Sequence, residues 1–146
     1  MNHAPALARF VAFFEKLDPA ALECLGDIFA EEVRFQDPFN EVVGIKAVRQ
    51  VFAHGLASCP GMRFEVFEAV PTMSRGEPVA LLRWRMDCQD KKGLVINGTS
   101  YIRFNPDGRV AEHIDYWDPA GQLYERVPVL GSLMRWLRRR ISATAL

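Results

Sequence analysis

Neither sign of charge is in excess in this sequence, since 18 Lys and Arg residues balance 18 Asp and Glu residues and the pI is about 6.8. Such a balance excludes a general nucleic-acid binder, which concentrates positive charge. No apolar run reaches the roughly 18 to 20 residues that cross a bilayer, so stable membrane insertion is not expected. The first residues also lack the basic start, apolar stretch and cleavage site of a secretory signal. A cytoplasmic location is therefore predicted.

Cysteine is scarce and odd in number. The three cysteines are Cys24, Cys59 and Cys88, at spacings that match no zinc motif and no CxxC pair. Three buried thiols in a reducing compartment are predicted, without a disulfide. His3, His54 and His113 are far apart in the sequence and have no partnering cysteine, so no metal site is expected. The GxSxG, P-loop and GxGxxG motifs are missing as well, and no cofactor is expected.

What the chain does contain is enough apolar sequence for one ordinary domain. Its 146 residues are 49% hydrophobic, and folding at this length removes about 70% of the unfolded chain's surface from water. A single domain over residues 1–146 is expected, with residues 128–146 as a basic helical extension. The arginines of this extension could touch anionic lipid. The favoured interpretation is a solvated basic face whose apolar side closes the domain.

Helices are predicted in the first part of the chain. Apolar residues three and four apart indicate a helix over residues 4–17. Asp18-Pro19 is typical of a helix start, and the apolar stripe of this second helix runs to Phe29. A third helix follows Gly44 and ends at residues 59–61.

Strands dominate the rest. A short strand through Val33 and Phe35 stops at Asp37-Pro38. Alternation resumes at Met62, with a change of phase that predicts a bulge near Val66. Three further strands are expected in consecutive antiparallel hairpins, at residues 79–89, 94–104 and 109–118, with turns at 90–93 and 105–108. Helices first and strands afterwards indicate the α+β class, with a curved sheet covered by helices on one face and a pocket inside the resulting cone.

Three segments, FAEEVRFQDP, GIKAVRQVFAHGL and RFNPDGRVAEHIDYWDP, occur in an order that resembles the NTF2-like superfamily, in particular its SnoaL-like and ketosteroid isomerase-like members. The resemblance covers nearly the whole chain. It implies a cone in which a curved antiparallel sheet wraps around the N-terminal helices, with a pocket for a small hydrophobic molecule. The same cone serves isomerases, epoxide hydrolases, polyketide cyclases and non-catalytic binding proteins, so function depends on the site.

One site hypothesis comes from likeness to limonene-epoxide hydrolase. The segments WRMD and IDYWD resemble those of that enzyme's Asp-Arg-Asp site, which implies Asp87, Arg85 and Asp115. Asp115 would remove a proton from water, Asp87 would protonate the departing oxygen, and Arg85 would order both carboxylates. The resemblance to SnoaL-like cyclases also implies an acidic residue in the site at the position of Asp115.

This hypothesis depends on which face of the strand at 79–89 lies inside. Arg83, Arg85 and Asp87 alternate with Trp84 and its apolar neighbours Leu82 and Met86. In one interpretation the charged side lines the cone, and the Trp84 side forms a homodimer interface. In the other, the charged side is in water, where its ion pairs contribute little, and the Trp84 side packs against the helices.

A second hypothesis comes from likeness to ketosteroid isomerase. FAEEVRFQDP resembles the segment that ends in its proton-shuttling aspartate, which implies Asp37 as the base. The positions of its oxyanion-hole tyrosine and protonated aspartic acid correspond to Phe10, which cannot donate, and to Ser100. Ser100 or Tyr101 would then steady an enolate. Alternatively, Asp37 belongs to an Asp-Pro turn and caps a local backbone N–H.

The expected function is cofactor-free acid–base chemistry, either epoxide hydrolysis or isomerisation, on a small hydrophobic substrate. The alternative is a non-catalytic ligand-binding or protein-interaction module of the same fold. Carboxylates gathered at the bottom of a closed pocket would favour the enzyme, and carboxylates on the outside would favour the module. His113 shares a face with Asp115, which would favour its imidazolium form, although a hydrogen-bonded, partly buried histidine is the commoner case. The residues expected to contact substrate are Phe10, Phe14, Phe35, Ser100, Tyr101, His113 and Trp117.

Overall fold

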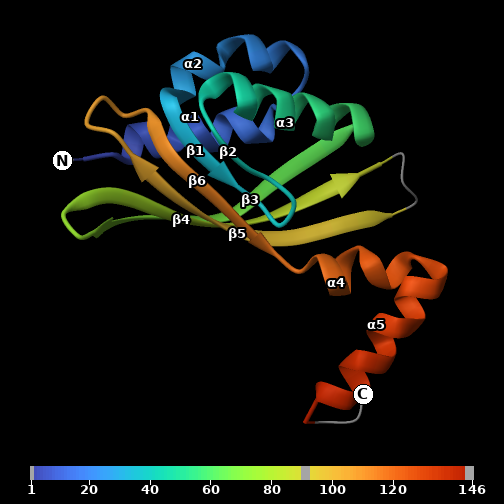
Figure 1. The fold of residues 1–146 in the computed structure, drawn as a ribbon. Helices are drawn as coiled ribbons and strands as arrows, with labels where there is room; N and C mark the ends of the chain where they lie inside the picture. The colour runs from blue at the N-terminus through green and yellow to red at the C-terminus, as the bar shows by residue number, and fades with distance from the viewer. Residues whose placement is uncertain (1, 90–92, 144–146) are drawn as a thin grey trace.

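A curved six-stranded sheet with helices packed on one of its faces forms the body of the protein (Figure 1). The computed structural model describes residues 2–89 and 93–143. The elements, in chain order, are α1 (Ala4–Glu15), the 3-10 helix η1 (Ala20–Cys24), α2 (Leu25–Ile28), β1 (Phe29–Gln36), β2 (Glu41–Val43), α3 (Ile45–Ser58), β3 (Met62–Ser74), β4 (Glu77–Cys88), β5 (Leu94–Phe104), β6 (Val110–Trp117), α4 (Pro119–Gln122), the 3-10 helix η2 (Tyr124–Arg126) and α5 (Pro128–Ile141).

The strand order is β2-β1-β6-β5-β4-β3. Strands β3 to β6 pair consecutively and antiparallel, as predicted, whereas β1 pairs parallel to β6. The sheet is therefore mixed, and the predicted α+β cone is confirmed. A register shift between Val66 and Glu68 places the predicted bulge at Phe67. The turn at residues 105–108 is present, closed by Gly108 at φ 83°, while the turn predicted at 90–93 falls largely on residues 90–92, outside the described residues.

The segment after Asp18 differs from the prediction. The Asp18 carboxylate does accept the Ala21 N–H at 2.8 Å, but the helix that it starts is broken at Cys24 into η1 and α2. Phe29 was expected on a helical stripe and is instead the first residue of β1, with no exposed surface and with Val110 of β6 as its partner. A helix and a strand would both bury the Phe29 ring, so burial does not distinguish the two conformations. The pairing of β1 with β6 makes Phe29 extended. The short β2 strand was not predicted.

Phenylalanine rings fill the space between the helices and the concave face of the sheet. The buried rings come from α1, β1 and α3, and they meet mainly edge to face; they are Phe10, Phe13, Phe14, Phe29, Phe35 and Phe52. Burial of each such ring stabilises the fold by about 1.5–3 kcal/mol. The aromatic core therefore positions whatever polar groups point into it.

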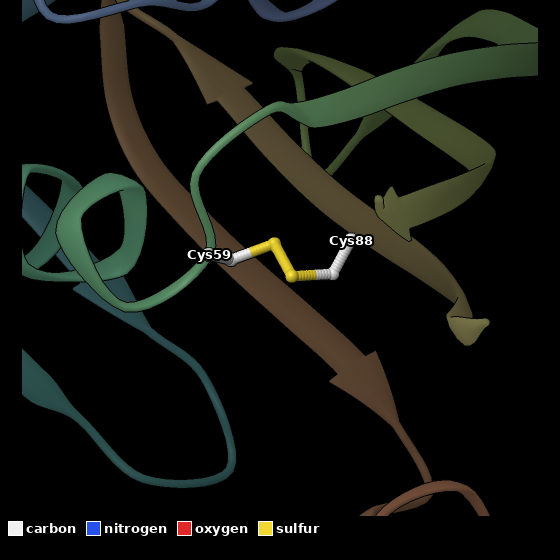
Figure 2. The surroundings of a disulfide bond; sticks show 2 residues. All are labelled: Cys59 and Cys88. Carbon is white, nitrogen blue, oxygen red and sulfur yellow. A yellow bond between two sulfur atoms is a disulfide. The ribbon is translucent and has the colours of Figure 1, made fainter. Parts of the chain in front are cut away.

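The prediction of three free buried thiols is wrong. Cys59, at the end of α3, and Cys88, at the end of β4, form a disulfide with their Cα atoms 5.5 Å apart (Figure 2), and Cys24 is a free, exposed cysteine. The two partners are 29 residues apart in the sequence and follow no motif, so only the β3–β4 pairing, which places Met62 opposite Cys88, brings them together. The reducing compartment inferred from free thiols loses that support.

The C-terminal helix α5 leaves the body of the domain (Figure 1). It packs on η2, and only Gly131 within it is buried. The expected closure of the cone by its apolar side is therefore wrong. None of the helices in the described residues is both long and apolar enough to cross a membrane.

Candidate functional site

The inward side of β5 and β6 carries a small polar cluster. On β6, His113 is buried and Asp115 lies two residues further along the same face, with its side chain 18% exposed. Ser100 of β5 stands directly opposite Asp115 in the antiparallel register. The strand period therefore places His113, Asp115 and Ser100 together, as the sequence predicted for the first two.

Hydrogen bonds in this cluster converge on one carboxylate oxygen. The indole N–H of Trp84 donates to Ser100 Oγ at 2.8 Å, and Ser100 donates to Asp115 Oδ1 at 2.5 Å. His113 Nε2 lies 2.7 Å from the same Oδ1. Because an indole can only donate, the Ser100 hydroxyl must accept from Trp84 and direct its own hydrogen to Asp115. The network holds Asp115 through Oδ1, and neither of these hydrogen bonds involves its Oδ2.

Aromatic rings enclose His113. Its ring centroid lies 5.0–6.2 Å from those of Phe10, Phe14, Phe29 and Phe35. Within the described part of the chain, His113 Nδ1 is the one buried side-chain nitrogen or oxygen that has no hydrogen-bond partner. A second N–H on Nδ1 would be a buried, unpaired donor, which costs more than an unpaired lone pair on a neutral ring. We therefore assign His113 as the neutral tautomer whose Nε2–H donates to Asp115.

A cavity of about 300 Å³ opens in front of Asp115. Its wall is mostly apolar and comes from α1, α3 and strands β1 and β3 to β6, together with the turn after β1. The lining residues include Phe14, Phe35, Asp37, Asn40, His54, Ser58, Trp84, Asp115 and Trp117. A smaller void of about 20 Å³ adjoins it, sharing Phe14 and Asp115 and adding Phe10, Ser100 and His113. Six of the seven side chains predicted to contact substrate thus border one of the two spaces.

Asp37 lies on the wall of the larger cavity, but its carboxylate also holds a turn. Oδ1 accepts the backbone N–H groups of Phe39 and Asn40, both at 2.7 Å, and the Asn40 side-chain amide lies 3.1 Å from each oxygen. These contacts are the ones that the turn-capping interpretation of Asp37 predicts. Asp37 and Asp115 also line the same cavity.

Arg85 and Asp87 do not join this cluster. They lie on the outer face of the sheet, with side chains 43% and 37% exposed, and bond to each other at 3.0 Å. The hydrogen bond from Arg85 and the negative charge of Asp87 raise the pKa of Arg85 above its ordinary value. The placement of this pair inside the cone is wrong, because Leu82, Trp84 and Met86 on the alternate positions fill the interior instead.

Tyr101 also faces away from the cavity. It alternates with the buried Ser100 on β5 and lies beside Leu81 and Tyr116 on the outer face. Trp84 was predicted only on an apolar face, for a dimer interface or for packing against the helices. It proves to line the cavity and to be the first donor of the network. Its signal was present in the apolar alternation of β4, which marks a buried face without saying what the face surrounds.

Asn40, His54 and Ser58 are further polar residues of the cavity wall that sequence reasoning missed. Asn40 follows the Asp-Pro turn and His54 and Ser58 lie on α3. These two elements are brought against the sheet only by the fold, and no local pattern links them to Asp115.

Comparison with known proteins identifies the fold. The chain is similar to a candidate isomerase of the SnoaL-like family from Agrobacterium tumefaciens, with a TM-score of 0.64, 22% identity, and coverage of 81% of this chain and 99% of that one. It is similar to an NTF2-like protein of unknown function from Exiguobacterium, with a TM-score of 0.62 and 21% identity over 77% and 98% of the two chains. A candidate polyketide cyclase from Xanthomonas campestris gives a TM-score of 0.56 and 15% identity over 80% and 93%.

Among curated proteins, none matches the chain. The SnoaL-like domain family matches residues 7–113, which is most of the chain and extends from α1 to His113. This protein therefore belongs to the SnoaL-like family, within the NTF2-like superfamily.

Proposed function

We propose that this protein is a cofactor-independent acid–base enzyme that moves a proton on a small, mostly apolar substrate, with Asp115 as the group that takes and returns the proton. One observation carries the proposal: Asp115 is a carboxylate on the wall of an apolar cavity, with both of its hydrogen bonds on Oδ1. A general base must be held in place and must also present a lone pair to its substrate. Asp115 meets both conditions.

The chemistry that fits is proton transfer at carbon. Asp115 Oδ2 would accept a proton from the carbon next to a carbonyl, the C–H electron pair would move into an enolate, and the same carboxyl would return the proton at a second carbon. Apart from Trp84, which is bonded to Ser100, the side-chain N–H and O–H donors on the wall, within the described residues, belong to Asn40, His54, Ser58 and Trp117. Trp117 lies on the same face of β6 as Asp115 and is the donor we assign to the enolate oxygen.

Isomerisation fits better than epoxide hydrolysis. Hydrolysis by the Asp-Arg-Asp arrangement needs an acid at the position of Asp87, and Asp87 lies on the opposite side of the sheet from the cavity. Proton transfer at carbon needs one mobile proton and one carboxylate. The names of two structural neighbours, a candidate isomerase and a candidate polyketide cyclase, fit this class of reaction.

Replacement of Asp115 tests the proposal. The assay uses a panel of β,γ-unsaturated ketones in D₂O, in which the wild type is expected to exchange the α-hydrogen and form the conjugated ketone. Asp115→Asn is expected to lower the rates of exchange and of product formation at least about 100-fold, the usual contribution of a general base. NMR measures exchange and product together. The matched control is Asp87→Asn, which makes the same change on the outer face and is expected to leave the rate unchanged.

Asp37→Asn separates the two carboxylates of the cavity. The asparagine keeps one oxygen for the N–H groups of Phe39 and Asn40, so we expect the exchange rate to stay within about tenfold of the wild type, the effect of a disturbed wall rather than of a lost base. The same NMR assay measures it. Loss of exchange in Asp37→Asn together with full activity in Asp115→Asn would transfer the role of base to Asp37 and refute our assignment.

A non-catalytic ligand-binding module remains the competing function, and the same panel distinguishes it. Stabilisation of the wild type by several panel members in a thermal-shift measurement, without exchange of any of them, would contradict the enzyme and support the module.

A homodimer and a cytoplasmic location also belong to this proposal. The dimer now has its support on the outer face of the sheet, where Val70, Leu81 and Tyr116 are each at least half exposed, since the Trp84 face is buried. The cytoplasmic location is an expectation from the sequence, and the Cys59–Cys88 bond counts against it, since such bonds are more typical of an oxidising compartment.

A further inference from the structure

The C-terminal helix α5 has an apolar side that the body of the protein does not cover. Val129, Leu133, Trp136 and Ile141 are 85%, 48%, 47% and 81% exposed. At 3.6 residues per turn these four side chains fall within less than half of the helix circumference. A helix of a globular domain normally buries such a stripe against its own core, so α5 presents a contact surface.

The other side of α5 is basic. Arg135, Arg138 and Arg139 occupy it. Arg140 follows Trp136 by one turn on the apolar side, where its guanidinium lies over the Trp136 ring, 5.2 Å from the centroid. Residues 126–146 contain five arginines and no acidic residue, so the preceding 125 residues carry five more acidic than basic groups. The zero net charge of the whole chain is therefore the sum of a positive C-terminal segment and a negative remainder.

The segment before α5 is fixed to the sheet through α4, and α5 is fixed to that segment. The backbone N–H of Asn97 in β5 donates to Gln122 Oε1 at 2.6 Å, and Gln122 Nε2 donates back to the Asn97 carbonyl at 3.1 Å. Arg135 donates to the Glu125 carbonyl at 3.0 Å, and Arg138 pairs with the Glu125 carboxylate at 2.5 Å. These contacts hold α5 in a defined direction while leaving Arg139 and Arg140 to solvent.

We propose that α5 docks the protein on the surface of an anionic phospholipid bilayer. An amphipathic helix that combines arginines on one side with tryptophan and leucine on the other binds in the interfacial plane, through apolar insertion and attraction to anionic headgroups. A nucleic acid would satisfy the arginines and leave the apolar stripe in water. The negative body is repelled by the same lipid surface, so α5 alone makes the contact and the body is held away from the headgroups.

Co-sedimentation of the full chain with lipid vesicles tests this surface. We expect binding to vesicles that contain phosphatidylglycerol, weak binding to vesicles of phosphatidylcholine alone, and a loss of binding as salt is raised from about 0.1 M to about 0.5 M. Arg139→Gln combined with Arg140→Gln is expected to weaken binding about thirtyfold, from the usual contribution of each cation at such a surface. The matched control, Lys46→Gln with Arg49→Gln, removes two charges from the exposed face of α3 and is expected to have no effect.

Insertion of the apolar side has its own measurement. Brominated acyl chains are expected to quench tryptophan emission of the bound wild type, and Trp136→Phe is expected to lose most of this quenching while still binding. Equal binding to both kinds of vesicle, absence of binding to phosphatidylglycerol, or equal loss in the α3 control would overturn the proposal. So would a change in oligomeric state of the Arg139–Arg140 variant without a change in vesicle binding, since α5 would then serve contact between copies of the chain.

Discussion

Replacing both disulfide cysteines, as Cys59→Ser with Cys88→Ser, is expected to lower the free energy of unfolding by about 3–4 kcal/mol, the loop-closure contribution for a separation of this size. The two residues are 29 positions apart, and the loop between them includes all of β3 and most of β4. Without the bond, the unfolded chain gains the freedom of that loop. Urea unfolding under non-reducing conditions measures the change.

Cys24→Ser is the control for this pair, because Cys24 is free and exposed; it is expected to unfold like the wild type. A reductant should bring the wild type to the stability of the double variant without altering the variant itself. Equal stability of wild type and double variant in non-reducing buffer would contradict the expected effect of the bond.

The disulfide also bears on the proposed site. Gly55 and Ser58 near its α3 end and Met86 near its β4 end line the cavity in front of Asp115, and the bond joins these two walls (Figure 2). Its loss is therefore expected to loosen this part of the cavity wall as well as to destabilise the fold.

Local patterns were sufficient to predict the four antiparallel strands β3 to β6 and part of the candidate site. Residues 62–118 alternate with period two and contain recognisable turns, so each strand pairs with its neighbour in the chain and the hairpins follow. The pairing of His113 with Asp115 needs only the same period. These features are local, and the structure confirms them.

Nonlocal features were out of reach of the same reasoning. Alternation shows that Arg85 and Asp87 share one face and Trp84 the other, but both faces of a strand in a cone can be buried, so the period alone does not say which one lines the interior. The parallel pairing of β1 with β6 decides that Phe29 is extended. The Cys59–Cys88 bond likewise depends on contacts between separate elements.

The exposed helix α5 illustrates the same limit at the level of charge. A formal balance of zero is a property of the whole chain, whereas attraction to a surface depends on where the charges lie. The four arginines of α5 make one end of a neutral protein strongly basic. The composition argues against a general nucleic-acid binder, yet it does not exclude an electrostatic contact made by one helix.

Gly98→Ala is expected to disturb the core and the candidate site together. Gly98 lies opposite Trp84 in the β4–β5 register, and a Cβ built on it would clash with the Cζ2 and Cη2 carbons of the indole. The indole would have to move, which would break its hydrogen bond to Ser100 and release the Ser100 hydroxyl from its single direction toward Asp115. We expect a loss of about 2–4 kcal/mol in unfolding free energy, from overpacking and from one buried hydrogen bond, measured by urea unfolding.

The control for Gly98→Ala is Gly55→Ala, because an added Cβ on Gly55 meets only the flexible end of Met62, at 3.7 Å, and a helical alanine is expected to stabilise by up to about 1 kcal/mol. Combining Gly98→Ala with Trp84→Phe should separate the two causes. The smaller phenylalanine ring removes the clash and the indole N–H together. The double variant should therefore lose less unfolding free energy than the sum of the two single variants. Its rate of α-hydrogen exchange should stay low, because Ser100 no longer accepts a hydrogen bond from the indole of residue 84. Strict additivity of the two losses would mean that Gly98 and Trp84 do not constrain each other, and full exchange in the double variant would mean that the Trp84–Ser100 bond does not position Asp115.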